Sequence, residues 1–217
     1  ISSLEEPDYR PKKCPYHSAN GMCTKCQIGA IVLQQQQFRM VDHVEFQSSS
    51  IIDSFIGYWR KTGYQRFGIM YGYYAEYDKV PLGIKAVVCA IYEPLQDCSV
   101  DGFELIENDS GEEESWNNAL LQLTQKMSLV PVGMIFTDLQ DDSSGTGKVL
   151  NKRNKDTFFI SGFEAVFSAQ MQAQYPSPSK HAPSGYFGSK FVSVVVSADE
   201  TGSIDLFPYQ VSNSCVA

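Results

Sequence analysis

The chain has 217 residues, of which 43% are hydrophobic and 19% charged, and its formal net charge at pH 7 is -8. A chain of this length can bury about 70–75% of its unfolded surface in one large domain, with or without a small appendage. No apolar run approaches the roughly 20 residues that a membrane helix needs, and the composition is that of a globular protein, so a membrane-spanning or disordered chain is excluded.

The negative charge is local. Residues 97–114 hold eight acidic residues and no Lys or Arg, whereas the 17 acidic and 17 basic residues elsewhere balance each other. A surface of this kind has no net attraction for phosphate, which disfavours a general role in binding nucleic acid.

The chain opens on a polar segment, residues 1–13, that we interpret as a linker. It begins with Ile1 and has no recognisable targeting signal, so we expect a fragment of a longer protein. Three of the six cysteines lie close together near this end and the other three are scattered. This distribution favours a reducing compartment over a secreted disulfide framework.

A zinc finger is predicted for residues 14–30, where "CPYHSANGMCTKC" has the spacing C-x2-H-x5-C-x2-C. Four such ligands can hold one tetrahedral Zn²⁺ and leave no open coordination position, so the metal should be structural. Its binding can supply roughly 10–16 kcal/mol toward folding the segment. The alternative is a set of free surface thiols with a chance histidine. Few cations are nearby, so we expect contact with protein rather than nucleic acid. The predicted ligands are Cys14, His17, Cys23 and Cys26.

A larger domain is predicted for residues 31–217. "AIVLQQQQFRMVDHVEF" is expected to be extended with a bend at its glutamines. "SSSIIDSFIGYWRKTG" has apolar residues at helical spacing, with Ser49 or Ser50 as N-cap and Gly63 just past the last turn. "YQRFGIMYGYYAEYD" and "LGIKAVVCAIYEP" are predicted to be paired strands with a turn near Asp78 to Pro81.

The second half of the sequence predicts, in chain order, a helix, a strand, an insertion, another helix and two strands. Apolar residues at helical spacing between Trp116 and Met127 indicate the first of these helices, and residues 130–136 the strand after it. A polar insertion occupies about residues 139–160, followed by a helix over 161–172 and the strands "KFVSVVVSA" and "SIDLFPYQVS". We therefore expect an α+β fold with a central mixed sheet.

Two of these segments resemble the MPN/JAMM metalloprotease family. Active members carry a glutamate three residues before one glycine and seven before another. In "QRFGIMYG", Gly68 and Gly72 stand at those offsets, and Gln65 takes the place of the glutamate.

The strand "VGMIFTDL" is similar to the family's V-G-x-x-H-x-H-P motif, whose histidines bind catalytic zinc. Phe136 stands at the first histidine, Asp138 at the second, and Leu139 replaces the proline. The family's serine and its aspartate ligand three residues later correspond to Ser161 and Glu164. A catalytic zinc needs about three protein ligands and a base beside its water, so we predict no catalytic residue here. We expect a binding surface with Asp138 as a structural or contact residue.

Nearly the whole chain from Cys14 onward resembles the nuclear protein localisation protein 4 family, with long matching segments such as "YWRKTGYQRFGIMYG", "VPLGIKAVVCAIYEP" and "GYFGSKFVSVVVS". This resemblance implies a zinc finger followed by an inactive MPN domain. It implies a cofactor that recruits substrates to the valosin-containing-protein-type AAA ATPase, pairs with ubiquitin fusion degradation protein 1 and binds ubiquitin or polyubiquitin.

The resemblance further implies that zinc fingers seat the cofactor on the ATPase ring and that an MPN groove accepts an unfolded ubiquitin segment. The expected location is the cytoplasm and nucleus, including the cytosolic face of the endoplasmic reticulum and nuclear envelope, without insertion into a membrane. The alternatives are an MPN-type deubiquitinase with altered zinc ligands and a zinc-knuckle nucleic-acid binder.

The insertion carries four basic residues that we interpret as a surface patch, either a solvated hairpin or a partner-facing surface: Lys148, Lys152, Arg153 and Lys155. "GTGK" at residues 145–148 lacks the first glycine of a phosphate-binding loop, so a surface turn is expected.

Overall fold

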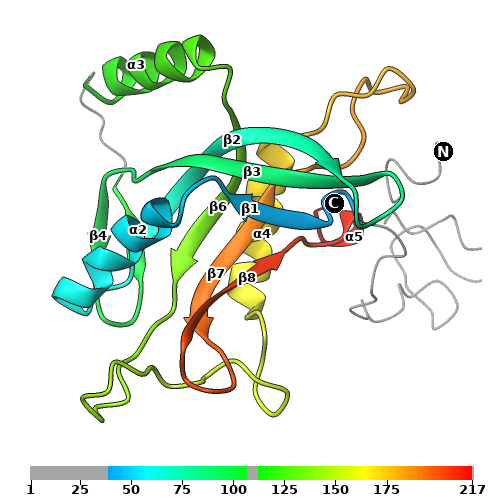
Figure 1. Ribbon diagram of the computed structural model, residues 1–217. Helices are drawn as coiled ribbons and strands as arrows, with labels where there is room; N and C mark the ends of the chain where they lie inside the picture. Colours follow the sequence, from blue (N-terminus) through cyan, green and yellow to red (C-terminus); the bar gives the residue numbers. More distant parts are fainter. Residues whose placement is uncertain (1–38, 107–111, 217) are drawn as a thin grey trace, which may run out of the picture.

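A six-stranded mixed β-sheet with helices on both faces forms the body of the protein. The computed structural model describes residues 39–106 and 112–216. The sheet has the strand order β1-β3-β2-β6-β7-β8, and β4 and β5 form a separate two-stranded hairpin (Figure 1). The strands are β1 (His43–Phe46), β2 (Phe67–Tyr77), β3 (Gly83–Tyr92), β4 (Gln96–Cys98), β5 (Phe103–Leu105), β6 (Val130–Thr137), β7 (Val192–Ala198) and β8 (Ile204–Tyr209). The helices are α2 (Ser49–Thr62), α3 (Glu112–Lys126), α4 (Gly162–Gln174) and α5 (Asn213–Val216). The expected α+β fold is confirmed.

The middle of the sheet combines antiparallel and parallel neighbours. β2 pairs antiparallel with β3 and with β6, whereas β1 runs parallel to β3 and β6 runs parallel to β7. Two glycines permit close approach of these strands. A Cβ at Gly72 would lie 1.8 Å from the carbonyl oxygen of Val87, and one at Gly133 would lie 2.4 Å from that of Val192. Because both obstacles are backbone atoms, neither position has room for a side chain.

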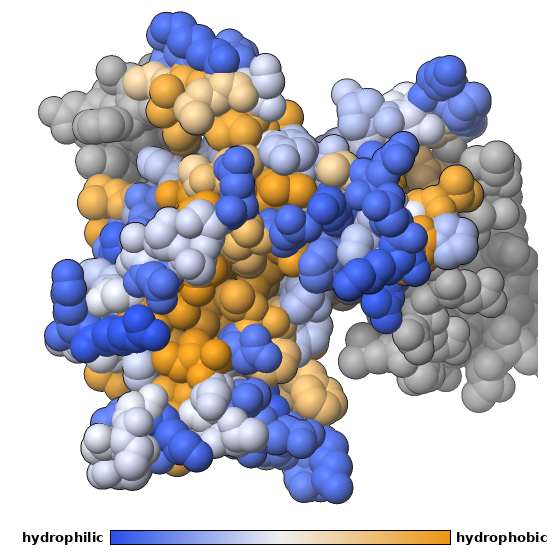
Figure 2. Space-filling model, in the orientation of Figure 1, coloured by the Kyte–Doolittle hydropathy of each residue, from blue (hydrophilic) through white to orange (hydrophobic). Residues whose placement is uncertain are grey.

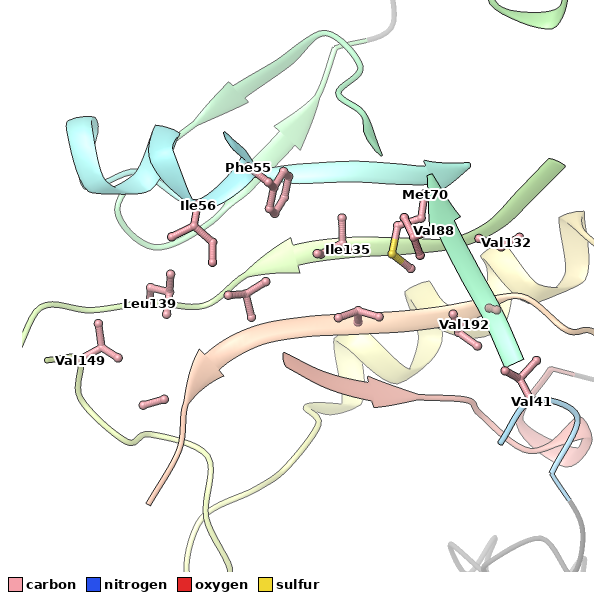
Figure 3. Packing of buried hydrophobic residues seen from close by; sticks show 14 residues of the cluster. Val41, Phe55, Ile56, Met70, Val88, Val132, Ile135, Leu139, Val149 and Val192 are labelled. Atoms are coloured by element: carbon pink, nitrogen blue, oxygen red, sulfur yellow. The ribbon is translucent and has the colours of Figure 1, made fainter. Parts of the chain in front are cut away.

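Hydrophobic cores fill both faces of the sheet. On one face, α2 packs Phe55 and Ile56 against side chains of β2, β3, β6 and β7 (Figure 3). In the space-filling view, hydrophobic side chains gather in the middle of the molecule between hydrophilic borders (Figure 2). On the other face, α4 adds Met171 to a cluster that includes Phe67 and Phe136. Each large apolar side chain buried in this way contributes about 1.5–3 kcal/mol, so the two cores fix the positions of the strand ends.

Helix α2 ends where the sequence predicts but begins one residue earlier. Its N-cap is Ser48, whose side chain accepts a hydrogen bond from the Ser50 N–H, so the expected N-cap at Ser49 or Ser50 is corrected. Gly63 closes the helix with a φ of 74°, and its N–H donates to the Trp59 carbonyl. A positive φ at this position favours glycine, and the two caps together set the length of the helix.

Helix α3 stands apart from the sheet (Figure 1). The apolar spacing of its sequence predicts a helix correctly, yet three apolar side chains in and just after it are more than half exposed: Leu121, Leu123 and Met127. Figure 2 shows hydrophobic atoms along its inner side and hydrophilic atoms along its outer side. Helical spacing thus predicted that this segment is a helix, but it did not predict that these apolar side chains are exposed.

Parts of the insertion after β6 are more deeply buried than its polar sequence suggests. Apart from a single bridge between Asp141 and Val149, it forms neither strand nor helix. Val149 nevertheless lies in the core beside Leu139, and the side chain of Arg153 is buried. The surface interpretation of this segment is therefore wrong for Arg153, for a reason that the site explains.

Candidate functional site

The five positions that the sequence aligns with a metalloprotease centre lie around one cavity of about 570 Å³. Phe136 lies within β6, and Gln65 precedes the neighbouring strand β2. Asp138 follows β6, and Ser161 and Glu164 begin α4. The antiparallel pairing of β2 with β6 places Phe67 opposite Phe136, and thereby brings Gln65 to the end of β6. The insertion separates Asp138 from Ser161 in sequence, and the fold reunites them.

The Gln65 amide clamps three segments together. It is 3% exposed, and its Nε2 donates to the carbonyl oxygens of Val100 and Leu139, both at 2.8 Å. Its Oε1 accepts from the Thr137 hydroxyl at 2.9 Å and from the Leu139 N–H at 3.1 Å. Two donors and two acceptors are thus satisfied, which a carboxylate at this position could not achieve.

Phe136 contributes an aromatic ring where the metalloprotease motif has a ligand. It is 4% exposed, and its ring centroid lies 6.3 Å from that of Phe103 in β5. A phenyl ring has no lone pair for a metal, so this position supports the packing of the cavity wall instead.

Arg153 occupies the space between Asp138 and Glu164, and its role was missed at the level of sequence. Its Nε donates to Asp138 Oδ2 at 2.7 Å, its Nη1 donates to Glu164 Oε2 at 3.0 Å, and its Nη2 donates to Glu164 Oε1. The Arg153 side chain is only 4% exposed. This residue therefore does not belong to a solvated basic patch, because two carboxylates hold its guanidinium inside the protein. The one sequence signal was an arginine between two acidic residues whose motif lacks the other ligands of a metal site.

The charges at this point are close to balanced. Lys152 Nζ lies 3.8 Å from Asp138 Oδ1, so two cationic groups accompany two carboxylates. Burial alone would raise the pKa of Glu164, but its hydrogen bonds from Arg153 and from the Ser161 N–H lower that pKa below its ordinary value. Glu164 is thus ionised at neutral pH, and it is already engaged.

Ser161 and Glu164 also form a capping box at the start of α4. The Ser161 hydroxyl accepts from the Glu164 N–H at 3.2 Å, and Glu164 Oε2 accepts from the Ser161 N–H at 2.7 Å. This reciprocal pair satisfies two backbone donors that a helix N-terminus leaves free. The serine and the acid three residues later therefore have a structural role that requires no metal.

Apolar side chains form most of the walls above this charged floor. The hairpin of β4 and β5 lies on one side, and the start of α4 with the end of the insertion lies on the other. Phe163 is 83% exposed, although it is a large aromatic residue beside the cavity. Asp101 and Glu104 add acidic groups on the hairpin side. The cavity is thus an open groove, and its apolar lining consists of Phe103, Leu105, Phe136, Phe158, Phe163 and Phe167.

The outer edge of β5 carries backbone groups that do not pair with β4. The Ile106 N–H donates to the Leu95 carbonyl and the Ser99 N–H to the Gly102 carbonyl. Because hydrogen-bonded pairs alternate in an antiparallel ladder, Phe103 and Leu105 direct their N–H and C=O groups away from β4. Both residues line the groove, so an extended chain could pair with this edge.

The residues around this groove do not fit a catalytic zinc. Asp138 and Glu164 are the only carboxylates among the five motif positions, and the Arg153 guanidinium already engages both. Within residues 39–106 and 112–216, no group of three or more His, Cys, Asp or Glu side chains could hold a metal ion. The predicted finger ligands Cys14, His17, Cys23 and Cys26 lie outside these described residues. In the same described part of the chain, no helix has the length and apolar character needed to cross a bilayer.

Comparison with known proteins gives matches along the whole chain. The model of the NPL4 family matches residues 66–217, and a model for the zinc-binding region of that family matches residues 1–63. The chain is 50% identical over 226 residues to Nuclear protein localization protein 4 of Saccharomyces cerevisiae, covering 100% of this chain and 38% of that protein. The proteins of the same name from Meyerozyma guilliermondii and Schizosaccharomyces pombe are 49% and 46% identical, covering 100% and 98% of this chain and 38% and 37% of theirs.

Proposed function

The chain belongs to the NPL4 family, and on that premise we propose that it is a non-catalytic adaptor recruiting ubiquitin-tagged clients to a valosin-containing-protein-type AAA ATPase. The groove holds an unfolded segment of the client, ubiquitin included. The observation that carries this proposal is an open, aromatic groove whose floor offers neither a free base nor a metal-ligand set. The chain spans 38% of the yeast relative, so functions that need the rest of the protein are equally part of the proposal.

The chemistry of the groove supports binding over hydrolysis. A zinc hydrolase needs about three ligands, an open coordination position and a base. Here the Gln65 amide uses all its hydrogen-bonding groups, Phe136 cannot bind a metal, and Arg153 engages both carboxylates. A deubiquitinase with altered ligands is therefore the less supported alternative.

The shape and charge of the groove suit an extended, mostly apolar segment. Its volume of about 570 Å³ lies within the range of ligand sites, roughly 300–1,000 Å³. The balanced charges on its floor give no strong attraction to a net charge of either sign. We expect the client to add a strand to the edge of β5 that faces away from β4, because such pairing supplies affinity through backbone groups that every sequence has. Alternate client side chains would then face the phenylalanines.

The N-terminal region supplies the second half of the proposal. Cys14, His17, Cys23 and Cys26 hold one structural Zn²⁺, and this finger docks on the ATPase ring. The match of residues 1–63 to a zinc-binding family region supports the metal. Ubiquitin fusion degradation protein 1 is the expected companion cofactor. The expected setting is the cytoplasm and nucleus, including the cytosolic face of the endoplasmic reticulum, in ubiquitin-dependent degradation.

A role in binding nucleic acid through the zinc finger is the other alternative. The basic residues near the predicted finger are few, Lys12, Lys13 and Lys25, and they give phosphate little attraction. A protein partner therefore remains the better-supported choice.

Two variants of the full-length protein separate the two binding surfaces. Phe163→Ser removes an exposed aromatic side chain from the groove, and Cys23→Ser with Cys26→Ser removes half of the zinc ligands. Leu82→Ser is the matched control for the first, because Leu82 is 101% exposed and lies in the turn between β2 and β3, outside the groove lining. Binding is measured to a polyubiquitin-tagged unfolded substrate and, separately, to the ATPase.

We expect Phe163→Ser to weaken binding of the tagged substrate at least several-fold while ATPase binding stays unchanged. The double cysteine variant should show the opposite pattern, and Leu82→Ser should match the parent protein. Equal substrate binding by Phe163→Ser and the parent would refute the groove as the client site. Release of free ubiquitin from the substrate, suppressed by a chelator, would revive the deubiquitinase.

A further inference from the structure

One buried guanidinium connects the floor, the wall and the lip of the groove. The floor is Asp138 after β6, and the wall is Glu164 at the start of α4. The lip is the end of the insertion, residues 155–160. Arg153 Nη1 also donates to the carbonyl oxygen of Phe159 at 2.9 Å, and the guanidinium carbon lies 5.3 Å from the centroid of the Phe158 ring. Three parts of the site therefore meet on one side chain.

The lip has few other attachments to the protein. Its remaining hydrogen bonds within the described chain are local: Thr157 bonds to Lys152 and Asn154, and the Asp156 N–H donates to the Asn154 side chain. Such turn contacts fix the shape of the loop but not its place against α4. Within the described residues, the hydrogen bond from Arg153 to the Phe159 carbonyl is thus the one that links the lip to the charged floor.

The two carboxylates also need a cation for their own stability. Asp138 and Glu164 are 23% and 18% exposed, and both lie within hydrogen-bond distance of the same guanidinium. Like charges this close and this buried repel each other unless a cation lies between them. Arg153 satisfies Glu164 with two N–H groups and Asp138 with a third, which the planar fork of arginine permits and the point charge of lysine does not.

We propose that Arg153 takes the place of a bound metal ion in this site and acts as the positioning residue of the client groove. The inference rests on the proposed function of that groove. The guanidinium neutralises Asp138 and Glu164, and by its contacts with the Phe158 ring and the Phe159 carbonyl it holds Phe158 in the lining of the groove. The insertion therefore contributes a necessary part of the binding site instead of a solvated arm.

The test uses the full-length protein with Arg153→Met, which keeps the length of the side chain but removes its charge and donors, and with Arg153→Lys. A third variant combines Arg153→Met with Asp138→Asn and Glu164→Gln, which removes the charge imbalance without restoring the bonds to the lip. Lys148→Met, on an exposed lysine of the same insertion outside the lip, is the control. Hydrogen exchange of residues 155–160 reports on the lip, and the polyubiquitin-tagged unfolded substrate reports on the groove.

In Arg153→Met we expect faster exchange of the lip by at least tenfold and substrate binding weakened by about tenfold. Arg153→Lys should recover only part of each effect. The triple variant should regain thermal stability but keep the fast lip and the weak binding. Unchanged exchange and binding in Arg153→Met would overturn the proposal. So would full recovery of both in the triple variant, because the residue would then serve only charge balance.

A second measurement covers the case in which Arg153→Met fails to fold. Arg153→Gly leaves a cavity the size of the missing side chain, and millimolar ethylguanidinium should raise its melting temperature and slow its lip exchange more than equal sodium chloride does. Absence of such rescue would contradict the proposal. The lip exchange needs no client, so its result stands apart from that of the proposed function. A parent protein that binds no tagged substrate would refute the client groove and leave the positioning of the lip testable.

Discussion

Replacing Gln65 by glutamate restores the acidic residue of an active metalloprotease motif, yet the structure predicts loss of stability instead of gain of activity. The Gln65 Nε2 supplies the donors for two buried carbonyl oxygens, those of Val100 and Leu139. A carboxylate donates nothing. Each buried acceptor left without a donor costs about 1–3 kcal/mol, so the two together cost roughly 2–6 kcal/mol at neutral pH.

The pH dependence of this loss has a definite sign. Burial among carbonyl oxygens raises the pKa of the introduced carboxyl group in the folded variant above the unfolded value of about 4.3, because only the protonated acid can donate. The deficit relative to the parent protein is therefore smallest below about pH 4. It grows by about 1.4 kcal/mol per pH unit as the pH rises from there toward the folded pKa, and is constant above it.

Urea unfolding followed by tryptophan fluorescence at pH 4.5 and pH 7.5 measures both values. Gln122→Glu adds the same charge at an exposed position on α3 and should change the free energy of unfolding by no more than about 0.5 kcal/mol. A Gln65→Glu variant as stable as the parent protein at pH 7.5 would refute the argument that the amide is required. Cleavage of polyubiquitin by this variant would refute the non-catalytic role.

Three further outcomes are expected. Ser161→Ala should lower the free energy of unfolding by about 1 kcal/mol through loss of the capping box, whereas Ser161→Thr should restore most of it; equal stability of all three proteins in urea would contradict that role. Glu164→Gln should have a lower free energy of unfolding than the parent protein at pH 7, and the difference should shrink as the pH falls below the ordinary carboxyl pKa of 4.5. The reason is that the lowered pKa of Glu164 adds stability only while the group is ionised. A difference in stability that stays constant between pH 3 and pH 7 would contradict this interpretation. A strong chelator should remove one zinc per chain and weaken ATPase binding without changing the unfolding of the sheet domain, as judged by elemental analysis and fluorescence; zinc that cannot be removed without unfolding the sheet would argue against separate roles.

Local patterns in the sequence predicted the elements well. The spacing of apolar residues located α2 and α3, Gly63 marked the end of α2, and β-branched and aromatic residues located β2 and β3. These features depend on residues that are close together in the sequence, so they can be predicted from one short stretch of it. The N-cap of α2 shifted by one residue because three serines in a row offer equally suitable hydroxyls.

Features that depend on residues far apart in the sequence could not be predicted in this way. Spacing showed that α3 is a helix but could not show that Leu123 stays exposed, because burial depends on what packs against it. The frame of the site was predicted from the resemblance to a metalloprotease, yet Arg153 was assigned to a surface patch. Only the fold shows that the chain returns an arginine from the insertion to the two carboxylates. Likewise, the donors and acceptors of Gln65 come from segments 35 and more residues away.

The border between the two family models does not coincide with the border of the folded sheet domain. The models divide the chain between residues 63 and 66, whereas Phe55 and Ile56 of α2 lie in the core and β1 pairs with β3. A truncation at that border would expose the hydrophobic face of the sheet and remove a strand from its edge. The region that the zinc-binding family model matches thus extends into the sheet domain, and a cut at the border would divide that domain. Any recombinant fragment meant to isolate the sheet domain must begin before β1.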